Sequence, residues 1–586
     1  MDKNSVPNKT LLIPLYLGVA GHRDIREEDK ELLKHLIKEF VEQKQIECPH
    51  TPVVLLTPLA EGADQIAAWA AVESKIDFIA VLPMPVEEYK KDFVSPNSAL
   101  EFDSLLAKAS LIIELPLQDG TSIENVCNHE KRNEQYYQSG LFIARQCHVL
   151  IALWDGTDNG KKGGTADVVK LKKTGIPGKF EDKTKRLRHL QTGPIYHIIT
   201  PRKSNLVPDH PFTKIMYYPS QPENTPSMDE ENDKEILRRI DSFNKDFIKL
   251  GSALKEKIEK STSYLLPNHA DCVNNLTLCN IAEKHGITSE LATYFQKRRF
   301  LALKVLLSLV VLAFLFLHIN TEFLHKPLIL MLYPITMGIG ALWFFIANRE
   351  KFENKHEDYR ALSEAYRVQY FLNACGKQNS VSDHYLKRHR GELEWVLYAL
   401  RTSLLNDWKN DKTFREVNTV NQMKAFIFLK TNWVDDQLKY FRKTSIKHNL
   451  SAKKWELMAS CSFISAIVAA CLLFLVSFNA EKFPENLKSL EEIIHSVLSC
   501  STSVLLVLAA ALHGYSDKMV FAEQAKNYQQ MAQLFQLASD KLDHAINNND
   551  FDEANDIITE LAQEALLENG DWLLLHRSRP MENPKG

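Results

Sequence analysis

The sequence predicts an α/β, doubly wound N-terminal domain with a mostly parallel sheet. An all-α membrane region follows, with four transmembrane helices in two hairpins plus cytoplasmic helices. Two observations predict this fold class. Over residues 11–200, short apolar runs alternate with helix-like segments, which is the pattern of right-handed βαβ units. Further along lie four apolar stretches of about 20 residues, and each is long enough to cross a hydrocarbon layer about 30 Å thick.

The composition of the 586 residues excludes several classes of protein. Hydrophobic residues make up 45% and charged residues 25%, as in ordinary folded proteins, which excludes wholesale disorder and collagen-like fibres. The net charge of −3 leaves no basic excess to neutralise phosphate backbones, so we expect no nucleic-acid partner. The nine cysteines are scattered without a C-x-x-C pair, so we expect neither a metal site nor a disulfide framework. No secretory signal peptide is visible.

The N-terminal domain is predicted over residues 1–201. Its six strand candidates are Leu15–Ala20, Val53–Thr57, Phe78–Leu82, Leu111–Leu115, Val149–Trp154 and Ile195–Thr200. The clearest helical patterns between them cover residues 63–74, 98–109, 133–147 and 165–173. Parallel sheets of this kind bind ligands outside the carboxyl ends of their strands. We therefore expect a binding site where polar motifs directly follow strands.

Polar and glycine-rich motifs do follow three of these strands. Before the helix that starts at Thr165, two glycines allow close backbone approach, and the free N–H groups of the helix favour a phosphate. Arg23 could pair with phosphate bidentately, and Asp155 or Glu61 could accept from ribose hydroxyls. Instead of binding a ligand, His22 could be a turn residue or a buried histidine whose ring is hydrogen-bonded within the protein. The predicted ligand-binding residues are Gly21, His22, Arg23, Glu61, Gly62, Asp64, Asp155, Gly163, Gly164 and Thr165.

Two familiar nucleotide motifs are absent from the sequence. The dinucleotide fingerprint G-x-G-x-x-G does not follow the first strand, and the P-loop pattern G-x-x-x-x-G-K-[ST] is missing. An ordinary NAD dehydrogenase is therefore not expected. The sequence predicts a nucleotide as ligand and no resident cofactor.

The four apolar stretches cover residues 301–319, 328–347, 457–478 and 493–512. An arrangement in two tight hairpins argues against buried core helices of a soluble protein. Cationic residues precede the first span and follow the second span of each hairpin, which predicts a multi-pass membrane protein with both termini and residues 352–455 in the cytoplasm.

Hydroxyl groups within these stretches have two possible roles. In the third stretch, Ser462, Ala466 and Ala470 form a small-residue face of the kind that lets helices approach closely. In the fourth, Ser499, Thr502 and Ser503 are candidates for a pore lining, and helix–helix packing is the alternative. The sequence leaves both interpretations open.

The predicted organisation has six segments and a weak internal repeat. A Tyr-Phe pair precedes the first apolar span of each hairpin, at Tyr294-Phe295 and Tyr440-Phe441, and an amphipathic helix follows each hairpin. After the N-terminal domain come a linker and charged helix (202–286, with residues 202–233 as linker or loop), the first hairpin (287–351), a cytoplasmic helical region (352–455), the second hairpin (456–513) and C-terminal cytoplasmic helices (514–586).

Several motifs, in order, resemble the SLOG superfamily, the Rossmann-like group that contains the LOG and DprA proteins. They lie within residues 11–200 and read GHRD, PLAEGAD, LPMPVEEYKKDF, RNEQYYQSGLFIARQCHVLIALWDG and GGTADVV. The remainder, which ends in ALLENGDWLLLHRSRP, resembles the SLATT membrane effectors of bacterial conflict systems. Two hairpins occur here instead of the single hairpin of the simplest SLATT pattern.

The resemblance implies a function. It implies a sensor of a nucleotide-derived second messenger, a cyclic oligonucleotide or an ADP-ribose-like molecule. Such a sensor would oligomerise and form a pore or disrupt the inner membrane, in anti-phage defence by abortive infection. The implied partners are the lipid bilayer, further copies of the chain, and a nucleotidyltransferase or TIR-type enzyme that supplies the signal and acts indirectly.

The resemblance also bears on catalysis. LOG phosphoribohydrolases carry a PGG-x-GT-x-x-E motif whose Glu is catalytic. Aligning Gly164-Thr165 with its GT places Val168 at that Glu, and a valine cannot act as a general base. We therefore expect binding and no catalytic residue. The alternative is a membrane-anchored nucleotide-processing enzyme, phosphoribohydrolase or glycohydrolase-like, in which Asp167, Glu61 or Asp64 would supply acid–base chemistry.

Overall fold

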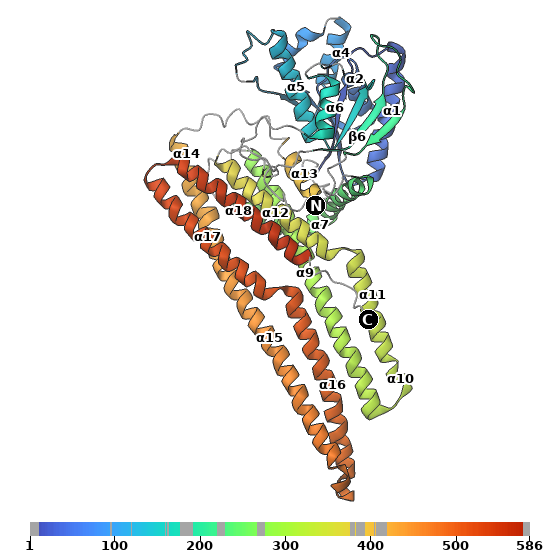
Figure 1. Cartoon of the computed structure of the whole chain (residues 1–586), viewed down its shortest axis with the longest axis vertical. Coiled ribbons are helices and arrows are strands. Elements are labelled where there is room, and N and C mark those ends of the chain that lie inside the picture. The colour runs from blue at the N-terminus through green and yellow to red at the C-terminus, as the bar shows by residue number, and fades with distance from the viewer. Residues whose placement is uncertain are drawn as a thin grey trace. The chain divides into compact units, whose positions relative to one another are not determined.

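The computed structural model describes residues 11–93, 96–118, 120–158, 160, 163–175, 192–219, 229–266, 276–375, 381, 393–403, 405 and 419–577. Lys161 and Lys162, which precede the predicted phosphate turn, lie outside these ranges. The chain divides into two compact units (Figure 1). Unit 1 comprises Met1–Ile287 and Asn379–Glu416, and unit 2 comprises Thr288–Gln378 and Val417–Gly586.

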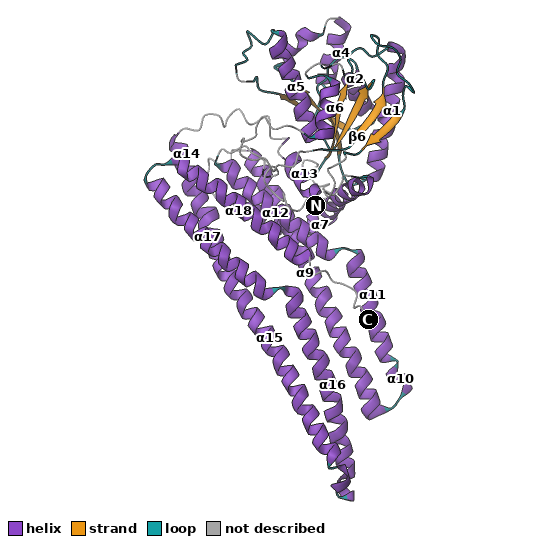
Figure 2. Ribbon diagram, viewed as in Figure 1, coloured by secondary structure: helices purple, strands orange, loops and turns teal. Residues whose placement is uncertain are grey.

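Unit 1 contains a seven-stranded mixed sheet with the strand order β4-β3-β2-β1-β5-β6-β7 (Figure 2). All six predicted strands are present. The seventh strand, β7, runs antiparallel to β6 within the segment that the sequence predicts as linker or loop. It is short and lies at the sheet edge, so it lacks the long apolar run of a buried strand. The strands are β1 (Leu15–Gly21), β2 (Val53–Thr57), β3 (Asp77–Leu82), β4 (Leu111–Glu114), β5 (Val149–Trp154), β6 (Ile195–Ile199) and β7 (Lys214–Tyr217).

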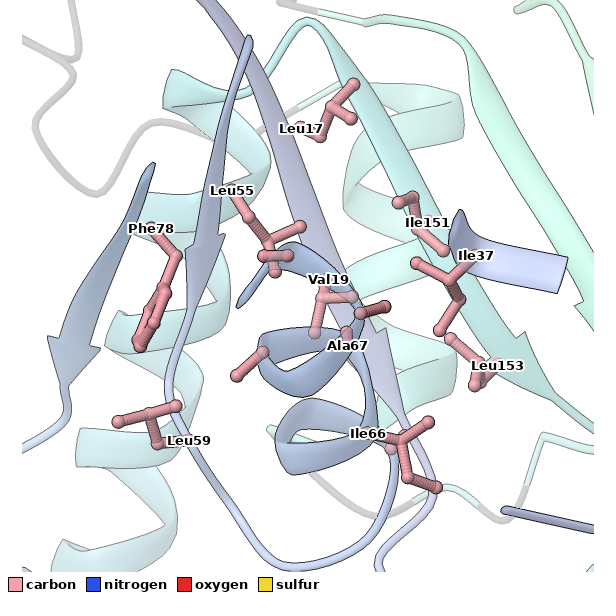
Figure 3. Packing of buried hydrophobic residues seen from close by; sticks show 14 of the residues in the cluster. Leu17, Val19, Ile37, Leu55, Leu59, Ile66, Ala67, Phe78, Ile151 and Leu153 are labelled. Carbon is pink, nitrogen blue, oxygen red and sulfur yellow. The ribbon is translucent and has the colours of Figure 1, made fainter. Parts of the chain in front are cut away.

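Helices cover both faces of this sheet. Side chains alternate along β1, so that Leu17 and Val19 join one buried cluster while Tyr16 and Ala20 join another on the opposite face. The first cluster packs against α1 (Lys30–Glu47), α2 (Ala63–Glu73) and α4 (Pro96–Leu106), and Figure 3 shows part of it. The second packs against α5 (His129–Gln146) and α6 (Thr165–Thr174). This arrangement is compatible with the predicted doubly wound domain.

Unit 1 also includes a helix from far along the chain. Besides α3 (Val86–Tyr89), α7 (Glu230–Leu265) and the start of α9 (Leu276–Ile319), it contains α13 (Glu394–Ser403). The Tyr398 hydroxyl donates to Pro14 O at 3.0 Å and accepts from Tyr16 N–H at 2.7 Å. Lys284 Nζ of α9 donates to Ser403 O at 3.1 Å. The helix α13 therefore joins the start of β1 to α9.

Unit 2 is helical and contains both predicted hairpins. The helices that carry the four apolar stretches are long and apolar enough to cross a membrane, by length and composition. Ser462 and Ala466 are buried, and Ser462 Oγ donates to Leu505 O at 3.0 Å, so the small-residue face packs against the neighbouring helix. The helices and helical turns are the rest of α9, η4 (Asn320–Leu324), α10 (Pro327–Leu330), α11 (Leu332–Arg349), α12 (Phe352–Ala374), α14 (Thr419–Leu429), η7 (Lys430–Val434), α15 (Asp435–Phe478), α16 (Lys488–Met519), α17 (Phe521–Asn547) and α18 (Phe551–Arg577).

The weak repeat in the sequence corresponds to a structural repeat in unit 2. Phe295 packs on Tyr359 of the helix after the first hairpin, with ring centroids 5.7 Å apart. Phe441 packs on Tyr528 of the helix after the second hairpin, also at 5.7 Å. Each of these helices, α12 and α17, starts after a residue with a positive φ of 51°. The same hairpin-plus-helix module therefore occurs twice.

Candidate functional site

The strand order places a topological switch point at the carboxyl ends of β1 and β5. The chain runs outward from β1 through β2, β3 and β4, and then returns to the other side of β1 with β5. Loops that follow β1 and β5 therefore leave in opposite directions, and open α/β sheets bind ligands at such a switch point. The predicted motifs Gly21-His22-Arg23 and Asp155 follow these two strands directly.

His22 connects the two loops. Its imidazole is 7% exposed, and Nε2 accepts a hydrogen bond from the backbone N–H of Asp155 at 2.9 Å. Burial lowers the pKa of His22 despite the nearby Asp155 carboxylate, which fits a neutral ring with an unprotonated Nε2. His22 thus positions the loops, as in the alternative interpretation of a buried, hydrogen-bonded histidine.

Both oxygens of the Asp155 carboxylate accept hydrogen bonds. Oδ1 accepts from Thr157 N–H at 3.0 Å, and Oδ2 accepts from Asn205 Nδ2 at 2.7 Å. These hydrogen bonds outweigh the effect of burial and lower the pKa of Asp155. The group is therefore an ionised part of this switch point.

Two of the predicted glycines are required by close packing at the start of α2. A Cβ on Gly21 would clash with the Ala63 side chain. Gly62 has a φ of +84°, and a Cβ there would lie 2.6 Å from His22 O and clash with Arg23 O. Glu61 lies partly exposed in the turn just before Gly62. Because Gly21 and Gly62 have no side chains, the N-terminus of α2 lies directly against the loop that carries Arg23.

Asp64, in the first turn of α2, is the most unusual group of this region. Its side chain is buried with 5% exposure, and no described residue hydrogen-bonds to its Oδ1. Burial raises the pKa of Asp64 to about 8, although Arg23 and a backbone hydrogen bond from Ala60 oppose the shift. A buried carboxyl oxygen without a partner is costly, and it marks a place where a ligand could complete the bonding.

A charged cluster that the sequence did not single out surrounds Arg23. The Arg23 guanidinium lies 4.9 Å from the ring centre of Tyr136 on α5. The Tyr136 hydroxyl donates to Asp92, which also accepts from Arg132 Nε at 2.8 Å. Arg23 is exposed, and the neighbouring Tyr89, Tyr136 and Asp92 raise its pKa, so the group stays a cation. The edge of the sheet thus holds a positioned arginine.

The predicted phosphate turn before α6 is already hydrogen-bonded to a side chain of that helix. Gly163, with a φ of +76°, packs against α5, and its N–H donates to Oδ2 of Asp167 at 2.9 Å. Gly164 is the N-cap and Thr165 is the first residue of α6, and both are partly exposed. Asp167 lies at the third helical position, and its side chain reaches back to the N–H of the residue before the N-cap. Its negative charge already complements the positive end of the helix.

Val168, the residue at the place of the catalytic glutamate in the resemblance, points into the core. It is 5% exposed and packs at Gly140 of α5, where an added Cβ would lie 2.5 Å from its Cγ2. The position therefore belongs to the α5–α6 contact and not to the switch point.

The three pore-lining candidates on α16 differ in their contacts. The Thr502 hydroxyl donates to Leu498 O of its own helix at 2.8 Å. Ser499 Oγ donates to Oε1 of Glu322 at 2.8 Å, and Glu322 lies in the tip of the first hairpin. Ser503 is partly buried.

The chain matches no family model, no curated protein and no solved structure. Among the residues that the structure describes, no group of three or more His, Cys, Asp or Glu could hold a metal ion. The site is therefore defined by its own geometry.

Proposed function

We propose that this chain is a ligand-gated membrane effector. Unit 1 would bind a nucleotide-derived second messenger, a cyclic oligonucleotide or an ADP-ribose-like molecule, at the edge that carries Arg23 and Asp64. Unit 2 would respond by opening a pore in, or disrupting, the bacterial inner membrane, in an assembly of several copies. The signal would come from a nucleotidyltransferase or TIR-type enzyme of an anti-phage system.

One observation carries this proposal. A buried carboxyl with an unpartnered oxygen and a positioned arginine share the switch-point edge of a sheet in a chain that also has four apolar helices. An arginine suits phosphate, and a carboxyl suits the donors and acceptors of a ribose or base. The N-terminus of α6 supports the proposal less strongly than its sequence suggests, because the Asp167 carboxylate already accepts a hydrogen bond from Gly163 N–H there.

The contacts of α13 support a route for the signal within unit 1. Tyr398 binds the backbone at the start of β1, and the end of β1 carries Gly21, next to Arg23. Ser403, at the end of α13, accepts from Lys284 of α9, and α9 continues as one helix into the first apolar stretch. A shift of β1 on ligand binding would be passed to a membrane helix through these bonds.

The decisive experiment uses the full-length protein in lipid nanodiscs and a panel of cyclic di- and trinucleotides and ADP-ribose. A ligand at 100 times its Kd should raise the stability of unit 1 by about 2.7 kcal/mol. Arg23→Ala should remove this thermal shift. Arg238→Ala, which removes an exposed arginine paired with Glu235 on α7, should retain it. The same nucleotide should release dye from liposomes that contain the parent protein. A panel in which no nucleotide shifts the melting or releases dye would contradict the proposal.

The raised pKa of Asp64 is the observation that favours the second candidate, a nucleotide-cleaving enzyme, because a protonated carboxyl can act as a general acid. Analysis of the incubated nucleotide separates the two functions. Unchanged nucleotide supports a sensor, whereas released base or sugar phosphate supports the enzyme.

The proposed topology, with both termini in the cytoplasm, rests on the cationic flanks of the hairpins. A periplasmic reporter that is active when fused at residue 400 would contradict it.

A further inference from the structure

Within unit 2, the tip of the first hairpin lies beside the interior of α16. Glu322 belongs to the η4 turn, and its Oε1 accepts from Ser499 Oγ at 2.8 Å. Ser499 lies six residues inside the apolar stretch that begins at Ile493, which corresponds to about 9 Å along a helix. Figure 1 shows the α15–α16 hairpin extending beyond the tip of the first hairpin. The two hairpins are thus staggered along their axes.

The stagger brings polar groups of the first hairpin tip beside the apolar stretch of α16. The tip is a formed turn: Asn320 is buried, its Oδ1 accepts from Lys326 N–H at 2.9 Å, and its backbone oxygen accepts from His325 N–H at 2.8 Å. The turn therefore holds Glu322, His325 and Lys326 together. An ionisable side chain inside the hydrocarbon layer costs about 2.5–3.5 kcal/mol on insertion scales, so such groups face water or polar partners.

A polar face on α16 continues from this contact. His495, Ser499 and Thr502 recur at spacings of four and three residues, which places them on one side of the helix. Ser503 extends the polar face around the helix. Further along α16 lies Leu506, which is 42% exposed. The polar face therefore has Glu322 beside it and ends within the apolar stretch.

We propose that Glu322 and Ser499 form a hydrated cation site in the outer part of the membrane unit, where water and cations would begin to cross. The carboxylate supplies a negative charge for a cation, and the serine hydroxyl fixes its orientation. The site rests on the proposed function, because a pore is what gives it a role. Its hydration, however, is a property of the resting protein and needs no nucleotide.

Two native cysteines allow a matched test of hydration. Cys500 follows Ser499 directly and is partly buried, whereas Cys471 on α15 is exposed on the apolar surface. The α15–α16 pairs Ser462–Leu505 and Trp455–Tyr515 show which residues are level along the hairpin. Nine residues from the first pair, or sixteen from the second, place Cys471 level with residues 496–499. The two thiols therefore lie at similar depth in different surroundings.

The experiment labels the full-length protein in lipid nanodiscs with membrane-impermeant methanethiosulfonates, one cationic and one anionic, and quantifies each cysteine by mass spectrometry. A thiol reacts as the thiolate, which forms in water and not in lipid. We expect Cys500 to react at least about tenfold faster than Cys471, with the cationic reagent preferred over the anionic one. Glu322→Gln keeps a hydrogen-bond acceptor for Ser499 but removes the charge. It should abolish the preference for the cationic reagent and leave the labelling of Cys471 unchanged.

Equal rates at the two cysteines would overturn the proposal, as would an unchanged preference in Glu322→Gln. Ser499→Ala is the second variant, and it should weaken the preference by releasing the carboxylate. None of these results depends on a nucleotide. If no nucleotide releases dye while Cys500 is hydrated and cation-preferring, the gating function fails and the hydrated site stands.

Discussion

Two helix N-termini at the same edge of the sheet look alike in sequence and differ in structure. The helix α2 begins Gly62-Ala-Asp64, and α6 begins Gly164-Thr-Ala-Asp167. Asp167 accepts from Gly163 N–H, whereas Oδ1 of Asp64 has no partner among the described residues. The carboxylate at the start of α6 is thus bonded within its own turn, whereas the carboxylate at the start of α2 has an oxygen without a described partner.

The difference follows from burial. Both carboxylates accept from a backbone N–H four residues earlier, Asp167 from Gly163 and Asp64 from Ala60. Asp64 is buried next to the loop that carries Arg23, so its second oxygen is shielded from water, whereas Asp167 is partly exposed. A glycine-rich turn before a helix is therefore weaker evidence for a ligand site than a buried carboxyl oxygen that has no partner among the described residues.

The largest expected effect comes from Gly62→Ala. Its positive φ and the close approach of His22 O should together cost about 3 kcal/mol or more. Gly156→Ala is the control, because Gly156 has a similar φ of +87° but no described residue within 4 Å of an added Cβ. Hydrogen exchange of peptides that cover β2 and α2, in the full-length protein, measures the loss. Equal losses in both variants would show that backbone strain and not packing sets the α2 terminus.

Asp64→Asn should give an effect of opposite sign that depends on pH. The pKa of Asp64 is raised to about 8 from an ordinary value of 3.8, so the folded state holds a proton that the unfolded state releases between these values. The stability of unit 1 should therefore fall as pH rises from about 4 to 8, and Asn should remove this fall. At pH 8 the variant should be more stable by a few kcal/mol, on the order of the pKa shift. Hydrogen exchange at pH 5 and pH 8 checks this, and an unchanged pH dependence would contradict it.

Asp167→Ala should have the smallest effect. It removes one capping hydrogen bond and a favourable charge at the helix N-terminus, which is worth about 1 kcal/mol. Exchange should increase in residues 163–175 and remain unchanged in α2. A loss that spreads to α2 would mean that the two termini are one cooperative structure and not two separate ones.

The sequence predicted the regular elements of the sheet well, because β1 to β6 are apolar runs bounded by polar or turn-forming residues. It missed β7, a four-residue edge strand, and it could not place α13 in unit 1. The Tyr398 contact joins residues 382 positions apart, and no local pattern encodes a partner at that distance.

The candidate site was predicted in part. Arg23 and Asp64 were found because they follow strands, yet Tyr89, Asp92, Arg132 and Tyr136 were not. Tyr89 and Asp92 follow β3, so the same rule would have included them. Arg132 and Tyr136 lie on α5, and only the folded topology brings α5 to Arg23. The role of Asp167 was readable from its spacing to Gly164.

The contribution of α13 to unit 1 has a consequence for the order of synthesis. The Tyr16 N–H can bond to Tyr398 only after Tyr398 has been synthesised, 382 residues later. Synthesis of that length takes roughly 20–80 s at about 5–20 residues per second. The first apolar hairpin emerges during this interval. The seven strands are therefore synthesised before the first apolar hairpin, whereas α13, the last helix of unit 1, follows that hairpin.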